Sequence, residues 1–111
     1  MTAAHFKLDN IVVIVDWNKI QNDGFVKETI GLDPIMEKWV SFGWRGIEID
    51  GHDMEAVVKA LDKAEKNRGR PFVIIADTVK GEGVSFMEHK PEFHGKAPND
   101  EELKKALEEL G

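Results

Sequence analysis

Two long apolar runs constrain the fold of this chain more than any other feature. The first, "NIVVIVD", has β-branched residues at every position from Ile11 to Val15, and the second is "FVIIAD", residues 72–77. Strands that helices cover on both faces have such continuous runs, whereas half-exposed strands alternate apolar and polar residues. Both runs therefore predict strands buried on both faces of an α/β sheet. A shorter strand is predicted at "RGIEID", residues 45–50.

Amphipathic helices are predicted between and after these strands. Asp33 is the expected N-cap of the first helix, with Pro34 at its first position, and Gly43 would end it. A second helix follows "GHD", and Asn99 with Glu102 predicts a capping box at the start of a third. The apolar faces expected for the three helices are Ile35, Met36, Trp39, Val40 and Phe42; Met54, Val57, Val58, Leu61 and Ala64; and Leu103, Ala106, Leu107 and Leu110.

Strands that alternate with amphipathic helices predict an α/β fold, with three αβα layers and a mostly parallel sheet in one domain over residues 1–111. The formal net charge of −6 argues against a nucleic-acid partner, because such binding relies on clustered Lys and Arg. No apolar run is long enough for a membrane span, and the N-terminus does not have the pattern of a secretory signal. The chain has no cysteine, which excludes disulfides and thiolate chemistry.

Polar clusters follow each predicted strand, at residues 16–23, 50–53 and 77–83. Ligands of open α/β sheets bind at the carboxyl ends of the strands, although a polar stretch also suits an ordinary strand-to-loop junction. If the first and third strands are near neighbours, the first and third clusters converge. The stretch from Asn18 to about Leu32 is predicted to be a loop, with Gly24 and Gly31 as breaks.

Three local motifs each allow two interpretations from the residues alone. "DTVKGEGVSF" places Lys80 before Gly81 and Gly83, which suits either a phosphate-binding loop or a flexible turn. "EFHGKAP" contains His94 and Lys96, and a lone loop histidine is more often a surface residue than a functional one. "DGHD" could be a metal cluster, but its consecutive spacing gives poor simultaneous ligation and favours a helix start.

Four segments in order resemble the thiamine-diphosphate-binding domain of transketolases: "KLDNIVVIVDWNKIQNDG", "FGWRGIEIDGHD", "PFVIIADTVKGEGVSFME" and "FHGKAPND". The similarity covers essentially the whole chain and is greatest to the N-terminal subunit of transketolases that are split into two subunits. It implies transfer of a two-carbon ketol unit between sugar phosphates, with thiamine diphosphate and Mg²⁺ or Ca²⁺ as cofactors. It also implies a cytoplasmic protein of the pentose phosphate pathway.

The resemblance assigns roles to five residues. Asn18, through its side-chain oxygen, and Ile20, through its main-chain carbonyl, correspond to ligands of the divalent ion, which prefers oxygen ligands. His94 corresponds to a catalytic histidine beside the diphosphate and the reacting centre. Lys80 and Lys96 correspond to positions on the cofactor or substrate side of that site.

The chain departs from the family pattern at its front, because Gly-Asp-Gly, the first half of the cofactor signature, does not occur in it. The opening "TAAHFK" is typical of the last turn of a helix, so we expect the C-terminal half of a cofactor-binding domain. The expected partners are the N-terminal half that carries Gly-Asp-Gly and a pyrimidine-binding domain or subunit. We expect the isolated chain to be inactive and to associate, with itself as a homo-oligomer or with the missing half.

Two other functional classes remain open. A non-catalytic α/β module for assembly or binding could keep this fold without the first half of the signature. A related thiamine enzyme, such as deoxyxylulose phosphate synthase or a 2-oxoacid dehydrogenase, is the other alternative. The segments "NKIQNDG" and "FHGKAP" fit transketolases better than either of these enzymes.

Overall fold

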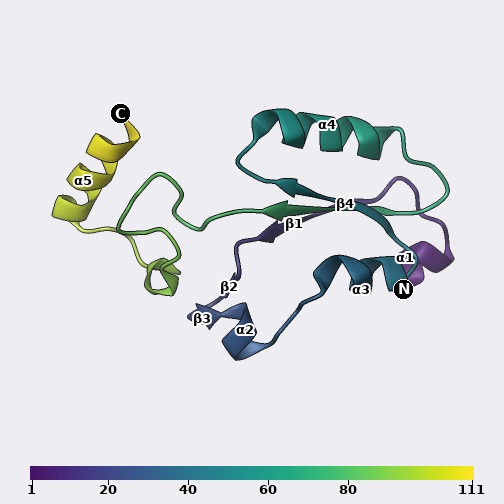
Figure 1. Ribbon diagram of the computed structural model, residues 1–111, viewed down its shortest axis with the longest axis horizontal. Helices are drawn as coiled ribbons and strands as arrows, with labels where there is room; N and C mark the ends of the chain where they lie inside the picture. Colours follow the sequence, from purple (N-terminus) through teal and green to yellow (C-terminus); the bar gives the residue numbers. More distant parts are fainter. The chain divides into compact units, whose positions relative to one another are not determined.

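A computed structural model describes residues 1–111 of the chain as two compact units, one of residues 1–17 and 32–78 and the other of residues 18–31 and 79–111. The elements in chain order are α1 (Thr2–His5), β1 (Val12–Trp17), β2 (Ile20–Gln21), β3 (Gly24–Phe25), α2 (Val26–Thr29), α3 (Ile35–Ser41), β4 (Arg45–Asp50), α4 (Met54–Glu65), β5 (Phe72–Asp77), the 3₁₀ turn η1 (Pro91–Phe93) and α5 (Asp100–Leu110) (Figure 1). None of these helices has the length and apolar character that crossing a membrane requires.

The first unit is built on a sheet of three parallel strands in the order β1-β5-β4. The central strand β5 contains the second apolar run, and its residues Val73, Ile74 and Ile75 are 0%, 2% and 2% exposed. Ile74 lies beside Ile14 on β1 and Ile47 on β4. The mostly parallel sheet predicted from the sequence is therefore confirmed, and the first and third of the predicted strands are neighbours in it.

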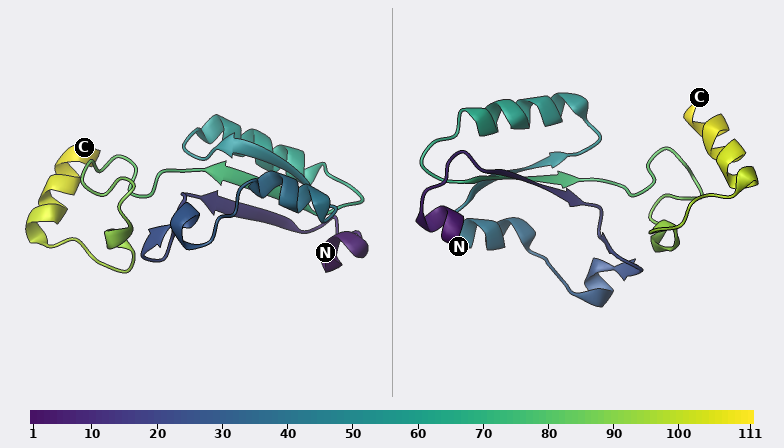
Figure 2. Two further views of the ribbon diagram at one scale, coloured as in Figure 1. Left: turned by 60° about the horizontal axis from the view of Figure 1, so that its bottom comes forward. Right: turned by 180° about the vertical axis from the view of Figure 1, so that it is seen from behind.

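Helices cover the two faces of this sheet and complete the three predicted layers (Figure 2). On one face, Ala60 and Ala64 of α4 pack against Phe72 and Ile74 of β5. The other face is covered by residues of α1 and α3, among them Trp39. The ring of Trp39 meets the buried Trp44 edge to face, with ring centroids 4.8 Å apart.

The expectation that β1 is buried on both faces is wrong. Along β1 the residues alternate between exposed and partly buried, and Val12 and Ile14 are 41% and 58% exposed. Val13 and Val15 pack on the face that α1 and α3 cover. On the other face α4 contacts β4 and β5. The edge strand β1 lies on the opposite side of β5 from β4, so α4 leaves it uncovered on this face.

The predicted start of α3 is also displaced. Pro34, which has extended backbone angles, occupies the N-cap position, and the helix begins at Ile35. The Asp33–Pro34 peptide bond is cis, and Asp33 makes no capping bond. The predicted stop is confirmed, since Gly43 follows the C-cap with a φ of +88°, a conformation that glycine adopts easily.

The apolar faces predicted for α4 and α5 are confirmed only in part, at Val57, Ala64 and Ala106. Alanines are the buried residues of both helices, Ala60 and Ala64 in α4 and Ala106 in α5. The larger side chains expected in the core are exposed, namely Met54, Val58, Leu61, Leu103, Leu107 and Leu110. In α4 the small side chains let the helix approach the sheet closely, so its larger residues are left at the margin of the contact.

Candidate functional site

The turn after β1 joins Asn18 to Ile20. The Asn18 side-chain oxygen accepts a hydrogen bond from the Ile20 N–H at 2.9 Å. Lys19, between them, has a φ of +63°, and its carbonyl accepts the N–H of Val26 at 2.8 Å. The two predicted metal ligands are therefore held in one short turn with a defined geometry.

The predicted loop after this turn contains a hairpin and a short helix instead. Strands β2 and β3 pair antiparallel, with Ile20 beside Phe25 and Gln21 beside Gly24. The connecting residues are Asn22, at a φ of +54°, and Asp23. Turn chemistry in the sequence, the run Asn-Asp-Gly between apolar residues, is the signal that could have predicted this hairpin. The side-chain oxygen of Gln21 is buried here without a hydrogen-bond partner.

The donors of this turn suit a divalent cation as part of a ligand set. The Asn18 amide oxygen and the Ile20 carbonyl are hard oxygen ligands, and an amide oxygen has two lone pairs, so it can accept an N–H and bind a cation together. No group of three or more His, Asp or Glu side chains that could hold a metal exists in the chain. The residues present therefore fit a divalent cation only as a partial ligand set of two neutral oxygens.

The segment that carries Lys80 is an ordered turn. The Lys80 carbonyl accepts the N–H of His89 at 3.0 Å, which closes the turn across nine residues. Gly81 has a φ of +77°, and a Cβ at this position would lie 2.7 Å from the carbonyl oxygen of Met87. Gly83 donates its N–H to a side-chain oxygen of Glu88 at 3.1 Å. Lys80 itself is half-buried at the start of this turn.

His94 and Lys96 follow the 3₁₀ turn η1, and both side chains are exposed. The His94 N–H donates to the carbonyl of Pro91 at 2.8 Å, which ends η1. The ammonium nitrogen of Lys96 lies 5.3 Å from the centroid of the Phe93 ring, within cation–π range. The Phe93 ring in turn meets Phe86 edge to face, with centroids 5.8 Å apart.

Helix α5 holds the Lys80 turn through a carboxylate that the sequence reasoning missed. Glu109 accepts from the Ser85 N–H at 2.5 Å and from the Ser85 hydroxyl at 2.8 Å. These bonds, the backbone one first, lower the pKa of Glu109 below its ordinary value, with a smaller contribution from Lys105 at 3.7 Å. No local sequence signal links Glu109 to a serine 24 residues earlier.

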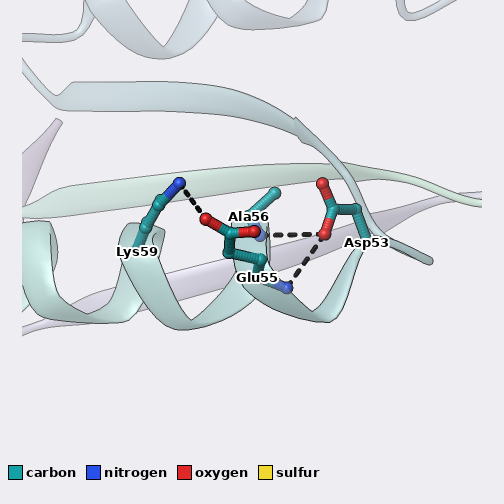
Figure 3. A network of polar contacts seen from close by, with 4 residues as sticks. All are labelled: Asp53, Glu55, Ala56 and Lys59. Atoms are coloured by element: carbon teal, nitrogen blue, oxygen red, sulfur yellow. Dashed lines mark hydrogen bonds and ion pairs between the residues drawn. The ribbon is translucent and has the colours of Figure 1, made fainter.

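The motif "DGHD" is a helix start, as its spacing predicts. Asp53 is the N-cap of α4, and one of its side-chain oxygens accepts the N–H groups of Glu55 and Ala56 at 2.9 and 3.2 Å (Figure 3). Lys59 pairs with Glu55 one turn further along the exposed side of the helix. Asp50 accepts the N–H of His52 at 2.8 Å. The carboxylates of Asp50 and Asp53 thus accept hydrogen bonds from backbone N–H groups.

The carboxyl ends of β1 and β5 lie side by side, as expected if the strands are neighbours. The Thr78 hydroxyl donates to a side-chain oxygen of Asp16, and the Thr78 N–H donates to the Trp17 carbonyl at 3.4 Å. The five predicted site residues all belong to the other unit. Asn18 and Ile20 lie in its stretch 18–31, and Lys80, His94 and Lys96 lie in its stretch 79–111.

Comparisons with known proteins agree on one family. The family model described as transketolase, thiamine diphosphate binding domain, matches residues 1–111. The chain is 46% identical to one subunit of an apulose-4-phosphate transketolase of Actinobacillus succinogenes and 38% identical to a 6-deoxy-6-sulfo-D-fructose transketolase subunit of a Clostridium species. Each alignment covers 99% of this chain and 40% of the relative, so the chain spans about two fifths of these proteins' length.

A solved structure is similar over the same range. A transketolase of Campylobacter jejuni, 34% identical, matches with a TM-score of 0.88 over 99% of this chain and 17% of its own chain. The arrangement of sheet and helices described above is thus the one found within a transketolase.

Proposed function

From these findings the chain belongs to the family of transketolase thiamine-diphosphate-binding domains, and we propose that it is the C-terminal portion of such a domain in a working transketolase. The proposed reaction is the transfer of a two-carbon ketol unit between sugar phosphates. Thiamine diphosphate, when bound, supplies the carbanion chemistry of this transfer. The role of the chain is to hold the cofactor through a divalent ion and to face the substrate.

The observation that carries the proposal is the bond between the Asn18 side chain and the Ile20 N–H at 2.9 Å. It orients the amide oxygen and keeps the Ile20 carbonyl in the same turn, so two neutral oxygen ligands can reach one ion. We propose Mg²⁺, or Ca²⁺ in its place, because both ions prefer such oxygens. Two neutral ligands bind a divalent ion weakly, so a carboxylate from elsewhere in the enzyme completes the set.

Three side chains of the stretch 79–111 have proposed roles toward the ligands. His94, exposed at the end of η1, is the proposed catalytic histidine beside the diphosphate. Lys80 and Lys96 are proposed to supply positive charge to the cofactor or the substrate. The two relatives named above act, by their names, on apulose 4-phosphate and on a sulfo-substituted fructose, so a ketose with an anionic group is the proposed substrate class.

The proposed partners are the part of the enzyme that carries Gly-Asp-Gly and a pyrimidine-binding domain or subunit. Gly-Asp-Gly does not occur in this chain, and both relatives named above are themselves called subunits. We also propose a homo-oligomeric assembly and a cytoplasmic location, where sugar phosphates of the pentose phosphate pathway are processed.

The test is a comparison of Asn18→Ala with Asn22→Gly in the enzyme assembled with its partner subunit. Asn22 lies in the same hairpin at a φ of +54°, so glycine removes an amide there without disturbing the backbone. Calorimetric titration with thiamine diphosphate and Mg²⁺ should show a large loss of affinity for Asn18→Ala and none for Asn22→Gly. Equal affinities in all three proteins would refute the metal-ligand assignment, and an assembled protein that binds no cofactor at all would favour a non-catalytic module.

A further inference from the structure

Helix α5 is tied to the turn that begins at Lys80 by contacts with two of the turn's residues. The carboxylate of Glu109 accepts both donors of Ser85, its N–H and its hydroxyl, at 2.5 and 2.8 Å. At the next residue of the helix, the Leu110 side chain lies 3.1 Å from where a Cβ of Gly83 would be. The Glu109 side chain is only 26% exposed, although it carries a charge at a helix end.

A line of ring contacts leads from this contact to Lys96. Phe86 follows Ser85 directly and meets Phe93 edge to face at 5.8 Å. Lys105, one turn before Glu109 on α5, places its ammonium nitrogen 5.1 Å from the Phe86 ring centroid and 3.7 Å from Glu109. The Lys96 ammonium nitrogen lies 5.3 Å from the Phe93 ring centroid.

We propose that Glu109 is a positioning residue, which fixes the Ser85 turn and, through the Phe86–Phe93 pair, sets the orientation of the Lys96 side chain. Lys96 has four rotatable side-chain bonds and an exposed head group, so its place over Phe93 depends on where that ring is held. The inference rests on the proposed function in one respect, namely that the Lys96 ammonium would contact the cofactor or the substrate. The coupling between Glu109 and Lys96 is a property of this chain by itself.

A carboxylate suits this role better than any other side chain of similar length. Two oxygens can accept two donors of one residue at once, and hydrogen bonds to a charged acceptor are stronger than those between neutral groups. An amide at the same position keeps one acceptor oxygen, so it can still bind the Ser85 N–H. Alanine keeps neither bond.

The experiment is nuclear magnetic resonance of the full 111-residue chain, without cofactor. The εCH₂ protons of Lys96 above the Phe93 ring should be shifted upfield by its ring current, and Phe93→Leu should abolish this shift as the positive control. Glu109→Ala should remove most of the shift, and Glu109→Gln should restore part of it. Glu108→Ala is the matched control, because it makes the same substitution at the neighbouring helix position, and it should leave the shift unchanged.

A second variant covers the possibility that Glu109→Ala unfolds α5. Ser85→Ala removes the hydroxyl bond and keeps the N–H bond, so it should reduce the Lys96 shift partially while the α5 amide signals persist. An unchanged Lys96 shift in both Glu109→Ala and Ser85→Ala would overturn the proposal, as would an equal loss in Glu108→Ala. These signals do not depend on thiamine diphosphate, so they separate this proposal from the metal-ligand assignment of Asn18.

Discussion

Replacement of Gly81 by alanine tests whether the Lys80 turn is as tightly closed as its contacts indicate. A Cβ at Gly81 would lie 2.7 Å from the carbonyl oxygen of Met87 and 2.8 Å from its carbonyl carbon and Cβ, whereas ordinary van der Waals contact begins at 3.4 Å. Two of these three atoms belong to the backbone, which cannot rotate away as a side-chain tip can. The turn must therefore open for alanine to fit.

Gly95→Ala is a control that isolates this steric effect. Gly95 belongs to the same unit and has a φ of +72°, close to the +77° of Gly81, but nothing lies within 4 Å of its Cβ position. Alanine at a positive φ costs about 1–2 kcal/mol, and loss of glycine freedom in the unfolded chain offsets about 0.4–1 kcal/mol of this. Overpacking adds about 1–3 kcal/mol at Gly81 alone. The difference between the two variants is thus about 1–3 kcal/mol.

The free energy of unfolding should be measured by urea titration with two probes. Far-ultraviolet circular dichroism follows the helices of both units, whereas all three tryptophans, Trp17, Trp39 and Trp44, belong to the unit with the sheet. We expect the loss of unfolding free energy in Gly81→Ala to appear in the transition followed by circular dichroism. Hydrogen exchange of the His89 amide, which donates to the Lys80 carbonyl, should also be faster in this variant. Equal stabilities of the Gly81→Ala and Gly95→Ala proteins would refute the closed turn.

Two further predictions concern α5. Asn99→Ala removes the capping box, in which the Asn99 side chain accepts the Glu102 N–H at 2.9 Å, and should cost about 1 kcal/mol by urea unfolding; an unchanged midpoint would contradict it. The lowered pKa of Glu109 means that its bonds to Ser85 contribute stability above the ordinary glutamate pKa and lose it as the pH falls through the lowered value. Exchange of the Ser85 amide relative to its intrinsic rate at each pH should rise as the pH falls over that acidic range in the wild type, and a ratio that stays constant would show that these bonds do not depend on the charge.

The sequence predicted the sheet well because each signal for it is local and strong. The run at residues 72–77 is continuous in apolar residues, and it is the strand that has a neighbour on each side and helices on both faces. The similar run at residues 11–15 belongs to an edge strand, and composition alone cannot separate these two positions. The face predicted for α4 included the buried Ala64 but left out Ala60 and included the exposed Met54, Val58 and Leu61, because larger apolar residues outweigh alanine in a periodicity argument.

The site residues were assigned by resemblance, and the geometry around them follows from interactions that the sequence does not display. The bond from the Ile20 N–H to the Asn18 side chain spans two residues. It could be anticipated, because asparagine side chains often bond to backbone groups nearby in the sequence. The bond between Glu109 and Ser85 spans 24 residues and involves one glutamate among several on the same helix. Only the fold distinguishes Glu109 from Glu108.

The placement of the proposed site residues gives α5 a structural part in ordering them, because the parallel sheet lies in the other unit. A strand fixes its side chains through the ladder of hydrogen bonds, but Lys80, His94 and Lys96 sit on turns and have no such ladder. Such turns keep a defined shape through backbone bonds, such as that from the His89 N–H to the Lys80 carbonyl, and through side chains that satisfy the remaining backbone groups. The carboxylates of Glu88 and Glu109 do this for Gly83 and Ser85, so the order of the proposed cofactor-binding turns depends on acidic residues that need not touch the cofactor.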